Sequence, residues 1–137
     1  QLLKDKVTSL SLSNSVSMPG AISAEKLPDV LNDHDCLIVS SFMEGVPVVL
    51  MEAMTKGMLV ISTAVGGVPE LVTHNQNGLI ITPGSVDSLA NAILDLAHRR
   101  EPLDAMRAAA RDTIVREFNV HHQGEQMQAL FEKYVRD

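Results

Sequence analysis

Residues 36–63, with the sequence CLIVSSFMEGVPVVLMEAMTKGMLVIST, contain two short apolar runs, at 36–39 and 58–61, on either side of a stretch long enough for one helix. Similar runs occur at 16–18 (VSM) and 79–81 (LII). Each run is continuous rather than alternating, which is typical of parallel strands covered by helices on both faces. The sequence therefore predicts an α/β fold, with one strand near each of the four runs.

Three helices are expected after the last strand, over residues 85–98, 102–117 and 120–135. Ser85 is a suitable N-cap for the first helix, and Pro102 is a suitable first-turn residue for the second. Helical spacing predicts an apolar face on each of them: Val86, Leu89, Ala90, Ile93 and Ala97 on the first, Leu103, Met106 and Ala110 on the second, and Met127, Leu130, Phe131 and Tyr134 on the third.

The composition indicates a single globular domain over residues 1–137, with 45% hydrophobic and 20% charged residues. The net charge of −6 and the scattered basic residues argue against nucleic-acid binding. No apolar run approaches the roughly 20 residues of a transmembrane helix, and no signal peptide is recognisable. The one cysteine, Cys36, lies in an apolar run, so it is expected to be a core residue rather than a nucleophile. It also indicates a reducing compartment.

The loop after the run at 36–39, with the sequence SSFMEGVP, is a candidate anion site. If a helix begins near Pro47, the amides of Val48 and Val49 have no acceptor within the helix, and the positive end of its dipole points into the loop. Gly45 leaves room for a ligand to approach the backbone. A phosphate or diphosphate is the kind of group that such a helix start binds.

Two carboxylates flank this loop, since Glu44 precedes the helix and Glu52 lies one turn inside it, on the face of Val48. An ionised Glu52 could accept hydrogen bonds from two vicinal hydroxyl groups. With the anion site, the two acids indicate a ligand such as a nucleoside-diphosphate sugar. A simpler interpretation also fits the spacing: Glu44 complements the helix dipole, and Glu52 points to solvent.

An ordered series of short motifs runs through the chain: Ser40-Ser41, Glu44 with Glu52, Glu52-Ala53-Met54, Gly66-Gly67 before Glu70, Asn77-Gly78-Leu79 and Pro83-Gly84. From about residue 16 to residue 134, this order resembles the carboxyl-terminal part of the group 1 (family 4) glycosyltransferases, which have the two-domain GT-B fold. The resemblance implies a Rossmann-like parallel sheet with flanking helices, which binds a nucleotide sugar.

The resemblance also implies a role for each matching residue. Glu44 would be the catalytic residue, holding the hydroxyls of the donor sugar near the reacting centre, and Glu52 would hold the ribose hydroxyls. The remaining donor-binding residues would be Gly45, Val46, Pro47, Val48 and Val49 at the diphosphate, and Ala21 and Ile22 beside the nucleobase.

Members of this family transfer a sugar, usually with retention of configuration. The resemblance implies a UDP-sugar or GDP-sugar donor, a saccharide or lipid-linked saccharide acceptor, and a place in polysaccharide or glycolipid biosynthesis. It implies no metal and no other cofactor. The expected location is cytoplasmic, or peripheral at the inner membrane in the intact enzyme.

The family's carboxyl-terminal domain has two further strands before the region that matches this chain, and an acceptor-binding domain precedes it. We therefore expect a truncated second half of a GT-B enzyme, inactive by itself, whose unpaired strand edges favour strand exchange or edge-to-edge pairing of copies. Two alternatives stay open: a non-catalytic α/β interaction domain, and a GT-B relative that epimerises or hydrolyses a nucleotide sugar.

Overall fold

The structure, a computed structural model, describes residues 2–99 and 103–135. These residues fall into two compact units, the first ending at Val30 and the second beginning at Leu31, where the sequence predicts a single domain. All three strands and the candidate anion loop belong to the second unit.

The first unit contains helix α1 (Leu2–Ser9) and the start of helix α2 (Leu27–Asn32). The strand predicted at residues 16–18 is wrong: this stretch has no regular secondary structure, and Val16 and Met18 are 39% and 38% exposed. A strand needs a hydrogen-bonded neighbour as well as apolar side chains. Within the described residues of this unit there is no other strand to supply one.

The second unit is built on a parallel sheet of strands β1 (Cys36–Val39), β2 (Leu59–Thr63) and β3 (Leu79–Ile81), in that spatial order. Ile61 of β2 pairs with Ile38 on one side and with Leu79 on the other. β2 is buried along its whole length, as expected of a central strand covered on both faces. The predicted α/β fold with a parallel sheet is confirmed, with strands at three of the four predicted positions.

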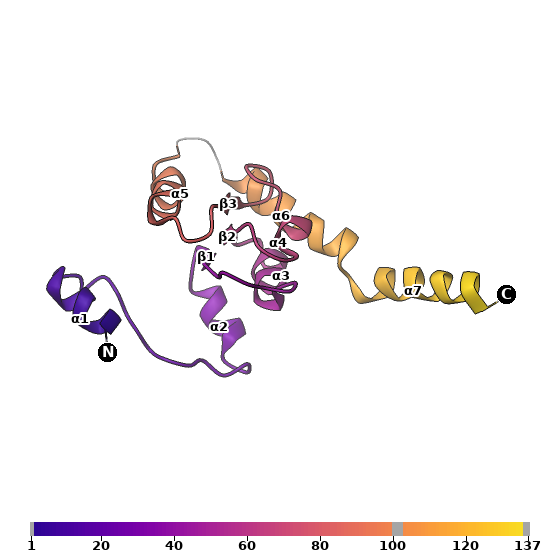
Figure 1. The fold of residues 1–137 in the computed structure, drawn as a ribbon, viewed down its shortest axis with the longest axis horizontal. Coiled ribbons are helices and arrows are strands. Elements are labelled where there is room, and N and C mark those ends of the chain that lie inside the picture. Colours follow the sequence, from indigo (N-terminus) through magenta and orange to yellow (C-terminus); the bar gives the residue numbers. More distant parts are fainter. Residues whose placement is uncertain (1, 100–102, 136–137) are drawn as a thin grey trace. The chain divides into compact units, whose positions relative to one another are not determined.

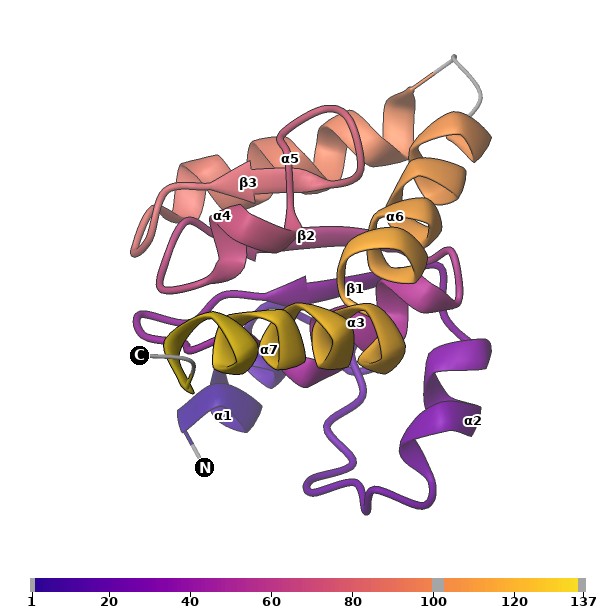
Figure 2. The ribbon, with the colours of Figure 1, turned by 90° about the vertical axis from the view of Figure 1, so that its right-hand side faces the viewer.

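Helices cover both faces of this sheet. Helices α3 (Val48–Thr55) and α4 (Val68–Leu71) lie on one face, and α5 (Val86–His98) lies on the other, as Figures 1 and 2 show. Ser85 caps α5 as predicted, because its Oγ accepts a hydrogen bond from the amide of Ser88 at 3.1 Å. A core cluster on the α5 side of the sheet consists of Leu59, Ile61, Leu79, Ile81, Ala92 and Met106.

Helix α3, which connects β1 to β2, has well-defined ends. It begins directly after Pro47, as predicted, and it is followed by Gly57, whose φ is +71°. The amide of Gly57 donates to the carbonyl of Met54 at 2.9 Å, and the amide of Met58 donates to the carbonyl of Ala53 at 3.0 Å. These two bonds form a Schellman motif, which ends the helix and turns the chain into β2.

The buried side of α5 agrees with the prediction at Leu89 but otherwise differs from it. Ala92 is buried, and Leu89 and Leu96 pack against the same cluster. The predicted Val86 and Ile93 are instead 79% and 42% exposed. Apolar residues occupy two overlapping faces of this helix, so spacing alone does not select the face that meets the sheet.

Helix α6 (Asp104–Glu117) packs against α3 and supplies hydrogen-bond donors to its carboxyl end. Arg111 Nη1 lies 2.9 Å from the carbonyl oxygen of Thr55, and Arg107 Nη1 lies 3.3 Å from that of Gly57. The last carbonyls of a helix have no partner within it, so Arg111 satisfies one that α3 leaves unpaired. Arg107 bonds to the turn just after the helix.

The apolar face predicted for α6 is buried, whereas the one predicted for α7 is exposed. In α6, Met106 and Ala110 are buried as predicted, while the predicted start at Pro102 lies outside the described residues. In α7 (Val120–Val135) no residue is buried. Its predicted apolar face is more than half exposed at each position: Met127, Leu130, Phe131 and Tyr134. Across residues 2–99 and 103–135, no helix combines the length and apolar character needed to cross a membrane.

Gly78 provides a test of this packing. A Cβ at this position would lie 2.6 Å from Cγ2 of Val60 and 2.9 Å from Cγ1 of Val72, both of which are buried. Gly78→Ala should therefore lower the free energy of unfolding by about 1–3 kcal/mol, because the added methyl group overpacks the core.

Urea unfolding measures this loss. Gly124→Ala in α7 is the matched control, since a Cβ there would meet nothing within 4 Å and alanine favours a helix. Equal free energies of unfolding for the two variants would contradict the packing described.

Candidate functional site

The candidate site is the loop of residues 40–47, which leaves the carboxyl end of β1 and enters α3. A second loop, residues 64–67, leaves the adjacent carboxyl end of β2 and enters α4. The amide of Gly67 donates a hydrogen bond to the carbonyl of Gly45 at 2.7 Å, so the two loops are joined. This edge of an open parallel sheet is where ligands generally bind.

The start of α3 presents free hydrogen-bond donors. Pro47 occupies the N-cap with φ −73° and ψ 113°, is buried, and has no N–H to satisfy. The first amide to bond along the helix is that of Leu50, which donates to the carbonyl of Pro47 at 3.0 Å. Within the described residues, four amides of the loop and the first turn make no hydrogen bond, namely those of Gly45, Val46, Val48 and Val49.

The two candidate glutamates, Glu44 in the loop and Glu52 in α3, have different surroundings. Glu44 is half-buried, and its Oε1 accepts a hydrogen bond from Ser41 Oγ at 2.5 Å. The carbonyl of Ser41 in turn accepts one from Thr63 Oγ1, at the buried end of β2, at 2.6 Å. The carboxylate of Glu52 is exposed on α3 and has no partner in the part of the chain that the structure describes. Glu44 is thus held by the protein, whereas Glu52 is free to meet a ligand.

The glycines of the two loops serve different purposes. Gly66 has a φ of +52°, and a Cβ there would lie 1.8 Å from the carbonyl oxygen of Glu44, so only glycine fits. A Cβ at Gly67 would lie 2.5 Å from Cγ2 of Val46. At Gly45, by contrast, a Cβ would meet nothing within 4 Å. The fold needs glycine at 66 and 67, and it leaves the space beside Gly45 open.

The site residues predicted between Glu44 and Glu52 all lie in this loop and the first two turns of α3. Ala21 and Ile22 lie in an irregular stretch of the first unit, so their assignment to a nucleobase stays a prediction. The sequence alone does not reveal the roles of Ser41, Thr63 and the Gly66–Gly67 pair. The serine and the glycines belong to the sequence motifs, but Thr63 gives no local signal, because its hydroxyl bonds to a residue that follows another strand.

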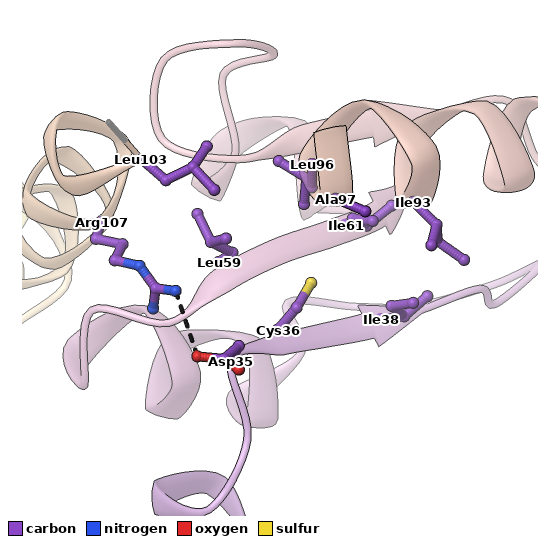
Figure 3. Close-up of a pocket in the computed structure, with 10 residues that line it drawn as sticks. All are labelled: Asp35, Cys36, Ile38, Leu59, Ile61, Ile93, Leu96, Ala97, Leu103 and Arg107. Carbon is purple, nitrogen blue, oxygen red and sulfur yellow. Dashed lines mark ion pairs between the residues drawn. The ribbon is translucent and has the colours of Figure 1, made fainter. Parts of the chain in front are cut away.

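An apolar hollow of about 350 Å³ lies elsewhere, between the sheet and α5, as Figure 3 shows. Cys36 points into it, and Arg107 Nη2 lies 3.6 Å from Asp35 Oδ1 at one end. Burial raises the pKa of the Cys36 thiol to about 11, so the group is protonated at neutral pH and agrees with a core role. The hollow is lined by Asp35, Cys36, Ile38, Leu59, Ile61, Ile93, Leu96, Ala97, Leu103 and Arg107.

This hollow is a poor candidate for the phosphate-binding site, because its lining is almost wholly apolar and none of the loop residues 40–47 contributes to it. Within residues 2–99 and 103–135, no three or more His, Cys, Asp or Glu side chains lie together in a way that could hold a metal ion. The loop after β1 therefore stays the candidate site.

Sequence comparison relates this chain to sugar transferases. Residues 1–113 match the family described as glycosyl transferases group 1. The amylovoran biosynthesis glycosyltransferase AmsK of Erwinia amylovora is 31% identical over 137 residues, which cover 96% of this chain and 34% of AmsK. The GDP-mannose-dependent alpha-(1-6)-phosphatidylinositol monomannoside mannosyltransferase of Mycobacterium tuberculosis is 40% identical over 72 residues, covering 53% of this chain and 19% of the relative.

Comparison of structures gives the same relationship. Alr3699/HepE of Anabaena, solved in complex with UDP, superposes with a TM-score of 0.86 at 28% identity, covering 96% of this chain and 36% of HepE. The same protein has been solved with UDP-glucose, with a TM-score of 0.83 at 27% identity. The sheet and its helices thus have the fold of part of a GT-B glycosyltransferase, and the chain spans about a third of the length of AmsK and of HepE.

Proposed function

The chain belongs to the glycosyl transferases of group 1, and on that basis we propose that it forms the donor-binding part of an enzyme that transfers a sugar from a nucleoside-diphosphate sugar to an acceptor. One observation carries the proposal: four amides with no hydrogen-bond partner among the described residues lie at the positive end of α3, between two carboxylates. Amides and a helix dipole suit a diphosphate, and carboxylates suit the hydroxyl groups of sugars.

Each part of the donor has a proposed partner. Glu44 contacts the transferred sugar, Glu52 accepts hydrogen bonds from the ribose hydroxyls, and the amides of residues 45–49 bind the diphosphate. Ala21 and Ile22 are proposed as contacts to the nucleobase. A UDP-sugar is supported by the HepE complexes and a GDP-sugar by the name of the mycobacterial relative, so both are candidates.

The proposed reaction breaks the bond between the anomeric carbon and the diphosphate and forms a bond from that carbon to a hydroxyl oxygen of the acceptor, with retention of configuration. The proton of the acceptor hydroxyl passes to the leaving diphosphate. Negative charge develops on the leaving diphosphate, where the amides and the start of α3 stabilise it. Because these groups already supply positive potential, we propose that no metal is needed. Glu44 lies on the other side of the breaking bond, where positive charge develops on the sugar.

The acceptor is proposed to be a saccharide or a lipid-linked saccharide. The names of AmsK and of the mycobacterial mannosyltransferase, which refer to a polysaccharide and to a glycolipid, support this class. Such a reaction would take place in the cytoplasm or at the inner face of the membrane.

The open edge of β1 leads to a prediction about the chain of 137 residues alone. Among the described residues β1 pairs only with β2, and Ile38 on it is 41% exposed. An open edge offers hydrogen-bonding groups to another strand. We expect this chain to exchange strands or pair edge to edge with a second copy, and to have no transferase activity by itself.

Light scattering over a range of concentrations measures the association. Ile38→Lys should shift the chain towards the monomer, since a charge on an edge strand opposes pairing. A wild-type chain that stays monomeric and thermally stable at every concentration would contradict the expectation.

The donor proposal is tested by calorimetry of the full-length gene product with UDP and GDP. One of these nucleotides should bind, and Glu52→Ala should weaken it about tenfold or more, because hydrogen bonds to a charged group are lost. Glu44→Ala should change the nucleotide affinity little but lower kcat in a transfer assay. Small, equal effects of both substitutions would contradict the assigned roles.

A glycine pair gives the matched control for this experiment. Gly45→Ala should keep the wild-type melting temperature, because the added methyl group enters open space. Gly124→Ala should keep or slightly raise it, because alanine also favours the helix of α7. Only Gly45→Ala should weaken nucleotide binding.

The same calorimetry distinguishes the two alternative functions. If the wild type binds no nucleotide, a non-catalytic interaction domain is favoured. If it binds a donor and epimerises or hydrolyses it without transfer, the isomerase or hydrolase alternative is favoured.

A further inference from the structure

Ser41 contacts the carboxylate of Glu44, and the proposed function gives it no role. Its Oγ lies 2.5 Å from Glu44 Oε1. An ionised carboxylate can only accept hydrogen bonds, so the hydroxyl of Ser41 is the donor. Hydrogen bonds from a hydroxyl to a carboxylate, at about 2.5–2.7 Å, are stronger than those between neutral groups. The bond therefore restrains the carboxylate firmly.

The backbone on both sides of Glu44 is also held. The carbonyl of Ser41 accepts a hydrogen bond from Thr63 Oγ1 at 2.6 Å, and Thr63 is only 2% exposed. On the other side, the amide of Gly67 holds the carbonyl of Gly45 at 2.7 Å. The side chain of Glu44 thus projects from a backbone that β2 and its loop fix at two points.

One oxygen of Glu44 stays available. Oε1 is engaged by Ser41, whereas Oε2 has no partner within the described part of the chain. A free glutamate side chain has several rotatable bonds, and ordering them on binding costs free energy. The bond from Ser41 removes part of that cost before the ligand arrives.

We propose that Ser41 is a positioning residue for the donor sugar: it orients Glu44 so that Oε2 accepts hydrogen bonds from the sugar hydroxyls. This inference rests on the proposed function. It adds that the hydroxyl of Ser41 determines how much the sugar moiety contributes to the affinity for the donor. The proposed contacts to the diphosphate and the ribose involve backbone amides and Glu52, which make no hydrogen bond with Ser41. Loss of the Ser41 hydroxyl should therefore affect the sugar and spare the nucleotide.

The test compares two ligand pairs by calorimetry of the full-length gene product: UDP with UDP-glucose, and GDP with GDP-mannose. In the wild type, the sugar should strengthen binding in at least one pair. Ser41→Ala should reduce that gain about fivefold to tenfold and leave the Kd of the bare nucleotide unchanged. Ser41→Thr keeps the hydroxyl and should restore the gain.

Ser62→Ala is the matched control, because the Ser62 hydroxyl is buried and has no hydrogen-bond partner in the described residues. It should leave the sugar gain unchanged. Thermal unfolding followed by circular dichroism shows whether each variant is folded. If Ser41→Ala does not fold, Thr63→Val gives the same comparison, with a smaller expected loss, because it removes only the bond to the Ser41 carbonyl.

The outcomes distinguish a failure of the proposed donor-binding function from a failure of the role proposed for Ser41. If the wild type binds neither nucleotide, the proposed function is overturned and the inference falls with it. If the wild type binds a nucleotide but gains nothing from the sugar in either pair, the inference alone is overturned. The same conclusion follows if Ser41→Ala keeps the wild-type gain.

Discussion

The hydrogen bond from the amide of Gly67 to the carbonyl of Gly45 joins two loops that leave neighbouring strands, and the shape of the candidate site depends on it. The loops approach so closely that a Cβ at Gly66 would overlap the carbonyl oxygen of Glu44. Because both loops leave the same parallel sheet, this contact fixes the backbone of Glu44 relative to β2 as well as to β1. A site with such a fixed shape binds a ligand with little further loss of conformational entropy.

Three glycines differ in whether the packing of the fold requires them. Gly78 is needed because its neighbours Val60 and Val72 leave no room for a side chain, and Gly66 because the loops meet there. Gly45 meets no such neighbour, and it lies among amides that have no partner in the described residues. Unbonded amides are tolerated where water can reach them, and a phosphate oxygen can replace that water. The open space at Gly45 leaves room for the proposed ligand.

The elements that local signals specify were predictable from the sequence. Apolar runs located β1, β2 and β3, and the Gly-Val-Pro sequence located the start of α3 at Pro47. Features that depend on distant neighbours were not predictable. The run at 16–18 has strand-like residues but no strand beside it among the described residues of its unit. The buried face of α5 depends on which side chains meet the sheet, and residue spacing alone does not determine this. Likewise, the Thr63 hydroxyl reaches Ser41 across 22 positions of sequence.

Residue-resolved amide hydrogen exchange by NMR on the ligand-free protein shows whether the two loops are joined before any ligand binds. The amide of Gly67 should exchange slowly, because it is bonded to the carbonyl of Gly45. The amides of Val46 and Val48, which have no acceptor among the described residues, should exchange close to the rate of an unstructured chain. If Gly67 exchanges as fast as Val46 and Val48, the loops are not joined in the free protein, and the site is not held in shape before a ligand binds.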